Sequence, residues 1–200
     1  MKYPESLYPK NDIVRPVVYE DILDVISAQS LPEGPIFEYG PSVGIYQLAM
    51  PGKEIVVRNW PEVDCMRKDY PDETFSCIIA DYTLEHLSKP WLAAQASYDM
   101  LRPGGIAVYT THWMFPDHTG TQEEDYWRFS PKGLRVLFDM FSQQISGCWG
   151  DGHLAGKFIE LNSQGYDKLL REYFPEYSDE QIANAKDRIY AVTTWVIAIK

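Results

Sequence analysis

Apolar residues near the N-terminus recur with the period of an amphipathic helix. They are Val17, Val18, Ile22, Leu23, Val25 and Ile26, with acidic residues between them. This spacing places the apolar side chains on one helix face. The following Leu31–Gly34 stretch contains Pro and Gly, which end helices. We therefore expect one N-terminal helix that stops before Leu31.

Four short apolar runs follow, and helical patterns separate some of them. The predicted strands are Pro35–Glu38, Ile55–Val57, Cys77–Ala80 and Ile106–Tyr109. A helix is expected over Ile45–Met50, after the first run, and another over Lys89–Leu101, between the third and the fourth. This alternation of strands and helices favours a parallel sheet that is covered by helices.

The second half of the chain predicts two more helices and a final strand. Ser130 suits a helix cap before Pro131, which leads into a helix over Lys132–Met140. Ser178 likewise precedes a helix expected over Asp179–Asp187. The run Tyr190–Ile199 is rich in β-branched and aromatic residues, so it predicts a last strand that is buried in the sheet.

The composition limits the classes of protein to consider. A chain of 200 residues suits one domain, and 45% hydrophobic with 24% charged residues is typical of a globular protein. The formal net charge of −11 repels the phosphate backbone, so we expect no nucleic-acid partner.

The sequence also bears on membrane association and on redox state. It contains no run of about 18 apolar residues, and Met1–Tyr8 has no basic segment followed by an apolar run. The three cysteines, Cys65, Cys77 and Cys148, form an odd set without CxxC spacing. We expect no membrane span, reduced thiols and a cytoplasmic location.

Small residues gather after the first apolar run. Gly40, Ser42 and Gly44 lie between Glu38 and a helical stretch, where the backbone turns and a ligand has room to approach. A dinucleotide-binding GxGxxG pattern needs glycine at Ser42 and Ile45, so an NAD(P) site is disfavoured. A tight connection without a ligand has the same local sequence, and at this point both interpretations stay open.

A longer set of motifs runs through the middle of the chain. Pro71-Asp72 precedes an apolar strand, Leu84-Glu85-His86 follows that strand, and Leu101-Arg-Pro-Gly-Gly105 precedes the next one. The combination resembles the class I S-adenosylmethionine-dependent methyltransferases, specifically the methyltransferase type 11 kind, over roughly residues 36–137. The resemblance implies an α/β fold that is Rossmann-like, with a mostly parallel sheet, helices on both faces and an antiparallel C-terminal strand.

The resemblance implies S-adenosylmethionine as the cofactor, with S-adenosylhomocysteine as the product. It assigns the glycine loop to the methionine and ribose parts of the cofactor, through Glu38, Gly40, Ser42 and Gly44. Asp64 takes the place of an acid that accepts a hydrogen bond from the adenine amino group. The alternative is that Asp64 is a solvated acid of a loop.

The chain departs from the family pattern after the run Ile55–Val57. The family commonly has an acid there that accepts both ribose hydroxyls, and this chain has Arg58-Asn59. Asn59 offers one acceptor oxygen, so it is a weaker substitute. Only four residues separate Asn59 from Asp64, which is too few for the usual intervening helix.

The residues after Cys77–Ala80 are expected at the carboxyl edge of the sheet. The resemblance places Asp81 and Tyr82 near the cofactor and His86 near the substrate. The Leu-Glu-His motif is general in the family, so a structural role for Glu85 and His86 is equally compatible. The spacing of Asp81, Glu85 and His86 matches no strong metal motif, and we expect no metal.

The most distinctive stretch follows the run Ile106–Tyr109, and a loop here would overhang the transferring methyl group. His118 is the first candidate for a general base and His112 the second, because neutral imidazole accepts protons near pH 7. Four residues are expected to line the acceptor side: Trp113, Tyr126, Trp127 and Arg128. The alternative is that residues 126–129 form a packing and hydrogen-bonding corner.

These observations predict one methyltransferase domain over residues 1–200. It would consist of an N-terminal helical cap (1–34), a cofactor-binding half (35–110) and an acceptor-side half (111–200). His153–Gly156 and Tyr166–Tyr177 form an extra segment that either shapes the acceptor pocket or covers the sheet edge as a helical insertion.

The expected reaction is methyl transfer from S-adenosylmethionine to an O, N or C nucleophile of a small molecule. Two alternatives stay open. One is a degenerate member of the family that acts as a non-catalytic binding or regulatory module. The other is non-methylating chemistry on the same fold, such as decarboxylation or cyclisation. The sequence does not predict an oligomeric state.

Overall fold

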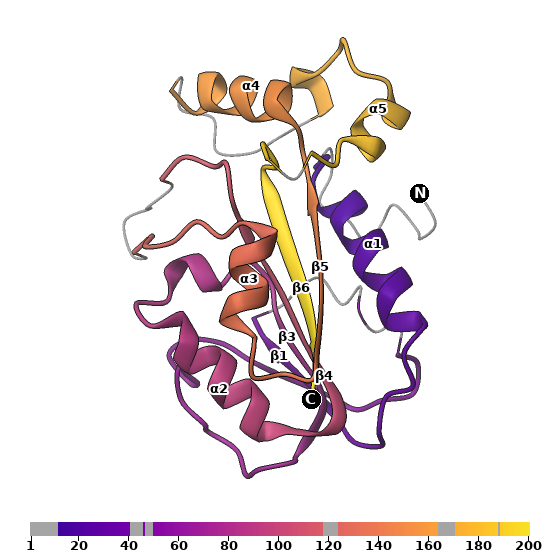
Figure 1. Cartoon of the computed structure of the whole chain (residues 1–200), viewed down its shortest axis with the longest axis vertical. Coiled ribbons are helices and arrows are strands. Elements are labelled where there is room, and N and C mark those ends of the chain that lie inside the picture. Colours follow the sequence, from indigo (N-terminus) through magenta and orange to yellow (C-terminus); the bar gives the residue numbers. More distant parts are fainter. Residues whose placement is uncertain (1–11, 41–45, 47–49, 118–123, 164–170, 188) are drawn as a thin grey trace.

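One six-stranded sheet organises the molecule (Figure 1). The computed structural model describes residues 12–40, 46, 50–117, 124–163, 171–187 and 189–200. Its strands are β1 (Ile36–Tyr39), β2 (Ile55–Arg58), β3 (Phe75–Ala80), β4 (Leu101–His112), β5 (Gln143–Trp149) and β6 (Thr193–Ile199). Their spatial order is β2-β1-β3-β4-β6-β5, and β6 runs antiparallel to both of its neighbours. The predicted fold class is confirmed.

Helices cover both faces of this sheet (Figure 1). Helix α1 (Arg15–Ser27) packs on one face, where its buried side chains join those of α4 (Gly152–Ser163) and α5 (Asp179–Asn184) in one core. Helices α2 (Pro90–Met100) and α3 (Pro131–Leu137) form the core on the opposite face. Two short 3₁₀ helices, η3 (Leu84–His86) and η4 (Arg171–Tyr173), complete the described helical elements.

The helix starts follow from local sequence. Asp12 Oδ1 accepts the backbone N–H groups of Val14 and Arg15 at 2.8 and 3.1 Å, which satisfies donors at the start of α1. Ser130 caps α3 by accepting the Gly133 N–H at 3.1 Å. Ser178 caps α5 in a capping box with Gln181. Both serine caps are therefore confirmed.

Several boundaries differ from those predicted. β4 extends through His112, so this histidine ends a strand instead of lying in the loop after it. β6 begins at Thr193, three residues later than expected, and α5 ends at Asn184, before Asp187. The connection from Asn59 to Thr74 contains no helix, as the short spacing predicted. The helix expected over residues 45–50 lies largely outside the described residues.

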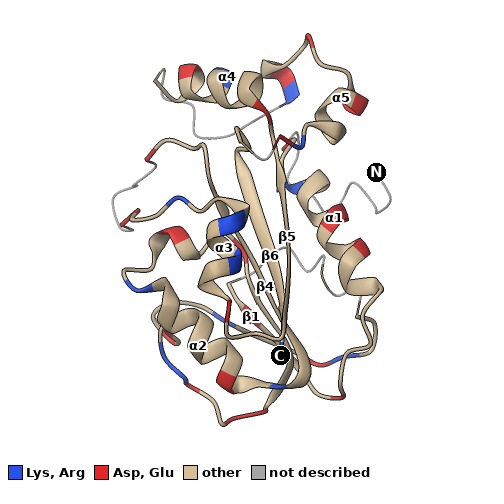
Figure 2. Cartoon of the chain, in the orientation of Figure 1, with Lys and Arg blue, Asp and Glu red and all other residues tan. Residues whose placement is uncertain are grey.

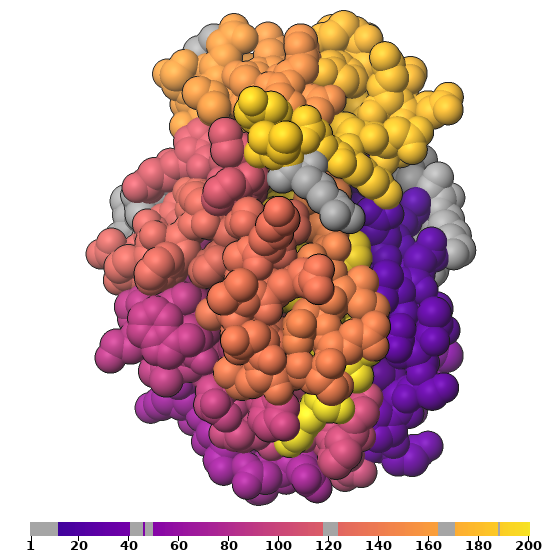
Figure 3. All heavy atoms as spheres, in the orientation of Figure 1, coloured from indigo at the N-terminus to yellow at the C-terminus, as the bar shows by residue number. Residues whose placement is uncertain are grey.

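The segment between β5 and β6 lies beyond the carboxyl end of β5 (Figures 1 and 3). Trp149, the last residue of β5, is fully buried and donates its indole N–H to the Ile182 carbonyl of α5 at 2.8 Å. Phe158 of α4 packs on Phe115, which follows β4, with ring centroids 4.4 Å apart. The segment is therefore attached to the same sheet edge at two points.

Gly147 explains how β5 and β6 pair closely. It lies opposite Trp195 in the strand register, and a Cβ built on Gly147 would come within 2.3 Å of the indole ring. Trp195 is only 5% exposed, so the ring has little room to move away. The indole occupies the space that a side chain on β5 would otherwise fill.

We predict that Gly147→Ala destabilises the protein by about 1–3 kcal/mol, because the added methyl group overpacks the contact with Trp195. Urea unfolding followed by tryptophan fluorescence measures the change. Gly156→Ala is the matched control, since Gly156 is an exposed residue of α4 with no atom near its Cβ position. That variant should be as stable as the wild type or slightly more stable. Equal midpoints for Gly147→Ala and the wild type would contradict the packing argument.

Candidate active site

The parallel strands end at one edge of the sheet, and this edge collects polar residues that the sequence singled out. Gly40 and Asn59 directly follow β1 and β2, Asp81 directly follows β3, and His112 ends β4. Ligands of open α/β sheets bind outside the carboxyl ends of the strands. This edge is therefore the candidate site.

Gly40 has the left-handed backbone conformation, with φ of +76°. Its N–H donates to the Arg58 carbonyl at 2.8 Å, which ties the ends of β1 and β2 together. A Cβ on Gly40 would lie 3.4 Å from Asn59 Oδ1. Glu38, two residues earlier on β1, is only 4% exposed. The structure thus places Gly40 beside Asn59, with a buried carboxyl group close by in the chain.

Asp81 is held by two hydroxyl groups from different elements. Tyr19 of α1 donates to one carboxyl oxygen, and Thr110 of β4 donates to the other. Burial raises the pKa of Asp81 above its ordinary value, although both hydrogen bonds and the nearby Arg15 favour the charged form. Asp81 therefore connects α1 to the sheet at the candidate site.

Tyr82 begins a series of aromatic rings in contact that crosses the edge, which we call the ring column. Its ring centroid lies 4.8 Å from that of His112, and His112 stacks on Phe115 at 3.7 Å. Phe115 in turn contacts Phe158 of α4. The guanidinium carbon of Arg15 lies 5.0 Å from the centre of the Tyr82 ring. The column links α1, the strand ends and α4, and it fixes the orientation of the His112 ring.

Glu85 of η3 is fully buried beside His112. Its Oε2 accepts the Thr111 hydroxyl at 2.8 Å, and its Oε1 lies 3.5 Å from His112 Nε2. Burial is the main cause that raises the pKa of Glu85 to about 7. The sequence did not assign this contact, although His112 ends β4 and Glu85 follows the adjacent strand β3.

The loop after β4 is attached to η3. The backbone N–H of Tyr126 donates to the Glu85 carbonyl at 2.7 Å, and His86 Nδ1 lies 2.7 Å from the Glu124 carbonyl. Trp127 donates its indole N–H to the Leu87 carbonyl at 2.9 Å. The side chains of Tyr126 and Trp127 stay 51% and 37% exposed, so both rings are accessible from solvent.

Arg128 holds the same loop together. It contacts both carboxyl oxygens of Asp125, and it donates to the carbonyls of Phe115 and Pro116 at 2.7 and 2.6 Å. These partners are all atoms of the loop, which favours the packing corner considered above. Trp113 is half-buried and donates its indole N–H to the Ile189 carbonyl at 3.2 Å, so it joins the loop to the segment before β6.

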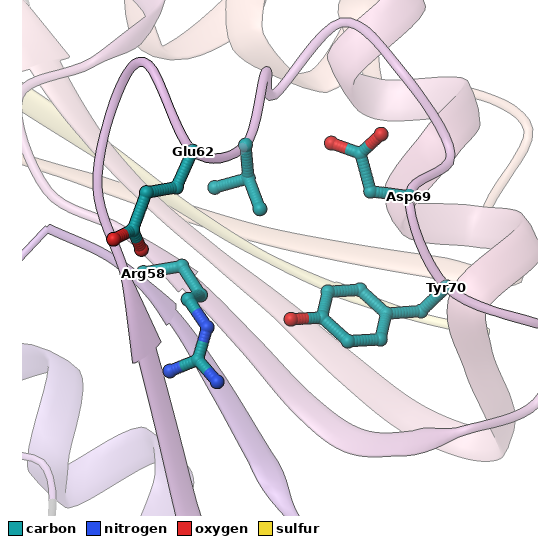
Figure 4. Close-up of a pocket in the computed structure, with 5 residues that line it drawn as sticks. Arg58, Glu62, Asp69 and Tyr70 are labelled. Atoms are coloured by element: carbon teal, nitrogen blue, oxygen red, sulfur yellow. The ribbon is translucent and has the colours of Figure 1, made fainter.

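Asp64 lies in the irregular connection between β2 and β3. Its Oδ1 accepts the Met66 N–H at 2.9 Å, and its Oδ2 lies 3.9 Å from Arg67 Nε. A pocket of about 670 Å³ opens in this connection next to Asp64, and its lining residues are Arg58, Glu62, Val63, Asp69 and Tyr70 (Figure 4). The remaining predicted site residues, Ser42, Gly44 and His118, lie outside the described residues.

Metal and membrane features were also searched within the described ranges. No group of three or more His, Cys, Asp or Glu residues there is arranged to hold a metal ion. No helix of the described chain combines the length and the apolar character needed to cross a membrane. The three cysteines are buried and form no disulfide.

Comparison with known proteins finds a partial match to a methyltransferase family model. A family model described as a methyltransferase domain matches residues 48–109, which include β2, β3, α2 and most of β4. The search of curated proteins finds no match.

Solved structures of methyltransferases share the fold. An S-adenosylmethionine-dependent methyltransferase of Thermotoga maritima, described as a possible histamine N-methyltransferase, is 13% identical with a TM-score of 0.55. The match covers 91% of this chain and 89% of that one. An S-adenosylmethionine-dependent methyltransferase of Archaeoglobus fulgidus is 11% identical with a TM-score of 0.55. The match covers 93% of this chain and 94% of that one.

A third structure was solved with S-adenosyl-L-methionine. It is phosphoethanolamine N-methyltransferase 2 of Haemonchus contortus, 10% identical with a TM-score of 0.53, and the match covers 92% of this chain and 52% of that one. At these identities the likeness shows the fold. Together with the family match, it confirms the resemblance to class I S-adenosylmethionine-dependent methyltransferases.

We predict that Glu85 makes the stability of the protein depend on pH. Its folded-state pKa of about 7 lies above the ordinary value of 4.5, so the folded state binds the proton more tightly than the unfolded state. The contribution of Glu85 to stability is fully present below pH 4.5 and is lost as the pH rises through 7. Glu85→Gln should therefore gain on the order of 2 kcal/mol relative to the wild type between pH 5 and pH 8.

Urea unfolding of both proteins across this pH range measures the difference. Glu172→Gln is the control, because Glu172 is exposed, and its difference from the wild type should stay constant with pH. A difference for Glu85→Gln that does not change with pH would contradict the raised pKa.

Proposed function

We propose that this chain binds S-adenosylmethionine at the carboxyl edge of its sheet and transfers the methyl group to a small molecule. The observation that carries the proposal is Gly40, where a left-handed backbone without a side chain leaves room beside Asn59. A ligand approaches the backbone most closely at such a position. The shared fold and the match to a methyltransferase domain support the same activity.

The polar groups at this edge suit the parts of the cofactor. Glu38 offers acceptors for an ammonium group or hydroxyls, and Asn59 offers one acceptor oxygen and an amide donor for the ribose. Asp64 suits the adenine amino group, because a carboxylate is a strong acceptor. When bound, S-adenosylmethionine supplies an electrophilic methyl group on a positively charged sulfur. Ser42 and Gly44 belong to the same proposed set.

Tyr82 is proposed to lie near the sulfonium end. Its ring already has the guanidinium of Arg15 above it, which is consistent with attraction between a cation and an aromatic face. Asp81, directly before it, is anchored by Tyr19 and Thr110 and so fixes the backbone at this position. Positioning of this kind supplies much of the rate in a displacement at a methyl carbon.

His112 is the described candidate for a general base, and His118 is the other. The ring of His112 is held between Tyr82 and Phe115, so its orientation is set before an acceptor arrives. An imidazole held in this way takes a proton from an O–H or N–H nucleophile as the methyl group is transferred. An acceptor that is already unprotonated needs no base.

The acceptor is proposed to approach from the loop after β4, past His86, Trp113, Tyr126 and Trp127. Exposed aromatic rings favour an organic molecule over a polyanion. The net charge of −11, with acidic residues on α1, α4 and α5 (Figure 2), also disfavours a nucleic-acid acceptor. Arg128 is proposed to keep this loop in shape.

The direct test is calorimetry with S-adenosylhomocysteine, followed by transfer of a labelled methyl group from S-adenosylmethionine to small-molecule fractions. Micromolar binding and an acceptor that gains one methyl group would support the proposal. Binding without methylation of any acceptor would favour non-methylating chemistry. Absence of binding would favour a non-catalytic module.

We predict that Gly40→Val abolishes binding of S-adenosylhomocysteine, because the branched side chain fills the space beside Asn59. Gly104→Val is the matched control. Gly104 has almost the same backbone conformation, with φ of +75° against +76°, but it lies at the opposite end of the sheet with open space around its Cβ position. Both variants carry the backbone strain, and only Gly40→Val should lose affinity in calorimetry. Equal affinities in two folded variants would remove Gly40 from the site.

We predict that Asp64→Ala weakens binding of S-adenosylhomocysteine by roughly tenfold or more, because a hydrogen bond to a charged acceptor contributes about 1.5–3 kcal/mol. Asp72→Ala is the control in the same connection, where Asp72 forms an exposed ion pair with Lys68. Its affinity should stay at the wild-type value. If Asp64→Ala binds as well as Asp72→Ala does, Asp64 is only a loop acid.

A further inference from the structure

Glu85 and His112 form a buried pair outside the residues that hold the cofactor in the proposed function. Glu85 is fully buried and His112 is 8% exposed, and Glu85 Oε1 lies 3.5 Å from His112 Nε2. We propose that these two side chains share one proton and act as a unit, in which Glu85 sets the protonation and orientation of His112. The pairing itself does not depend on the proposed function, but its catalytic use does.

The argument starts from the hydrogen bonds of the buried carboxyl group. Oε2 accepts the Thr111 hydroxyl, whereas no hydrogen bond of ordinary geometry reaches Oε1 from the described residues. A buried carboxylate oxygen without a donor is unfavourable. The nearby His112 Nε2 can supply the compensating charge. The pair therefore loses this shared proton less readily than two separate groups would.

Two arrangements of one proton leave the pair without net charge. Either Glu85 is a neutral acid beside a neutral imidazole, or Glu85 is a carboxylate beside an imidazolium. The proton moves from the carboxyl oxygen to the imidazole nitrogen, and no other atom changes. Groups that interact this closely titrate as a pair. Burial of Glu85 lowers the free-energy difference between the two arrangements, since it disfavours the isolated carboxylate.

The other charged and titratable groups around the pair are few within the described chain. Tyr82 contacts the His112 ring. His86 favours the charged form of Glu85 and Asp125 opposes it. Asp125 is itself neutralised by Arg128. The nearest charged groups thus partly cancel, and His112 Nε2 is the titratable group that lies 3.5 Å from Oε1.

The pair gives His112 a defined role in the proposed reaction. Once the shared proton has left the pair, the imidazole keeps its remaining proton on Nε2, directed toward the Glu85 carboxylate, and Nδ1 is the nitrogen that accepts a proton. The negative charge of Glu85 then stabilises the imidazolium that forms. Glu85 does not touch the acceptor in this arrangement, so it is a positioning residue.

The test is a ¹⁵N NMR titration of the histidine rings in the protein without cofactor. Glu85→Gln keeps an acceptor for Thr111 but removes the negative charge, so the pKa of His112 should fall by about one unit or more. The chain offers an internal control, because His153 Nε2 and Glu176 Oε1 are also 3.5 Å apart but exposed. Solvent screens that pair, so the coupling that Glu176→Gln removes should be much weaker than the one that Glu85→Gln removes.

A His112 pKa that is the same in Glu85→Gln and in the wild type would overturn the proposal. If Glu85→Gln does not fold, His112→Gln with ¹³C detection of the Glu85 carboxyl group tests the same coupling. The pKa of Glu85 should then rise, and an unchanged value would overturn the proposal equally.

The NMR titration tests the pair separately from the proposed function, because it is done without cofactor. Coupled titration in a protein that binds no S-adenosylhomocysteine would support the pair and remove its catalytic use. If the enzyme is active, Glu85→Gln should shift the acidic pH limb of kcat, on which activity is lost as His112 becomes protonated, while leaving S-adenosylhomocysteine affinity unchanged. A purely structural Glu85 would leave that limb in place.

Discussion

The carboxyl edge of the sheet contains acidic side chains that are withdrawn from water, and much of the local structure supplies hydrogen-bond donors to them. Asp81, which is half-buried, and Glu85, which is fully buried, both follow β3, and each carboxyl group has a donor within the protein. Consecutive residues of β4 supply them, since Thr110 donates to Asp81 and Thr111 donates to Glu85. Successive side chains of a strand point to opposite faces, so one strand serves one acid on each side of the sheet. Tyr19 of α1 adds a second donor to Asp81 and thereby fixes α1 against the edge.

Most of the fold could be predicted because its elements carry strong local signals. The apolar stripe of α1, the buried runs of β1 and β3 and the serine caps of α3 and α5 are all readable in short windows of sequence. β5 has no such signal, because its first five residues are Gln, Gln, Ile, Ser and Gly and are at most half-buried. It becomes a strand through its pairing with β6, where the Trp195 ring lies over Gly147. That contact joins residues 48 positions apart, and no pattern within β5 indicates it.

The candidate site was predictable in position but less so in detail. Gly40, Asn59, Asp81 and His112 lie at strand ends, and the topology alone brings such residues to one edge. The contact between Glu85 and His112 depends on how η3 turns after β3, which residue types and spacing do not specify. For Arg128 the residue type suggested a substrate contact, whereas its position three residues after Asp125 within a closed loop determines its partners. Long side chains of this kind are assigned reliably only when the backbone around them is known.

The place of β6 between β4 and β5 sets an order for the assembly of this molecule. Both neighbours are made before β6 as the chain is synthesised from its N-terminus, and β5 pairs with no other strand in the described sheet. Until residues 193–199 have been translated, β4 presents an open edge and Trp149 and Cys148 have no strand beside them. Strands β1 to β4 can pair before the chain is complete, whereas β5 can join the sheet only after β6 has been made. A nascent chain stalled before β6 would therefore be a substrate for chaperones, even though most of its residues had already emerged.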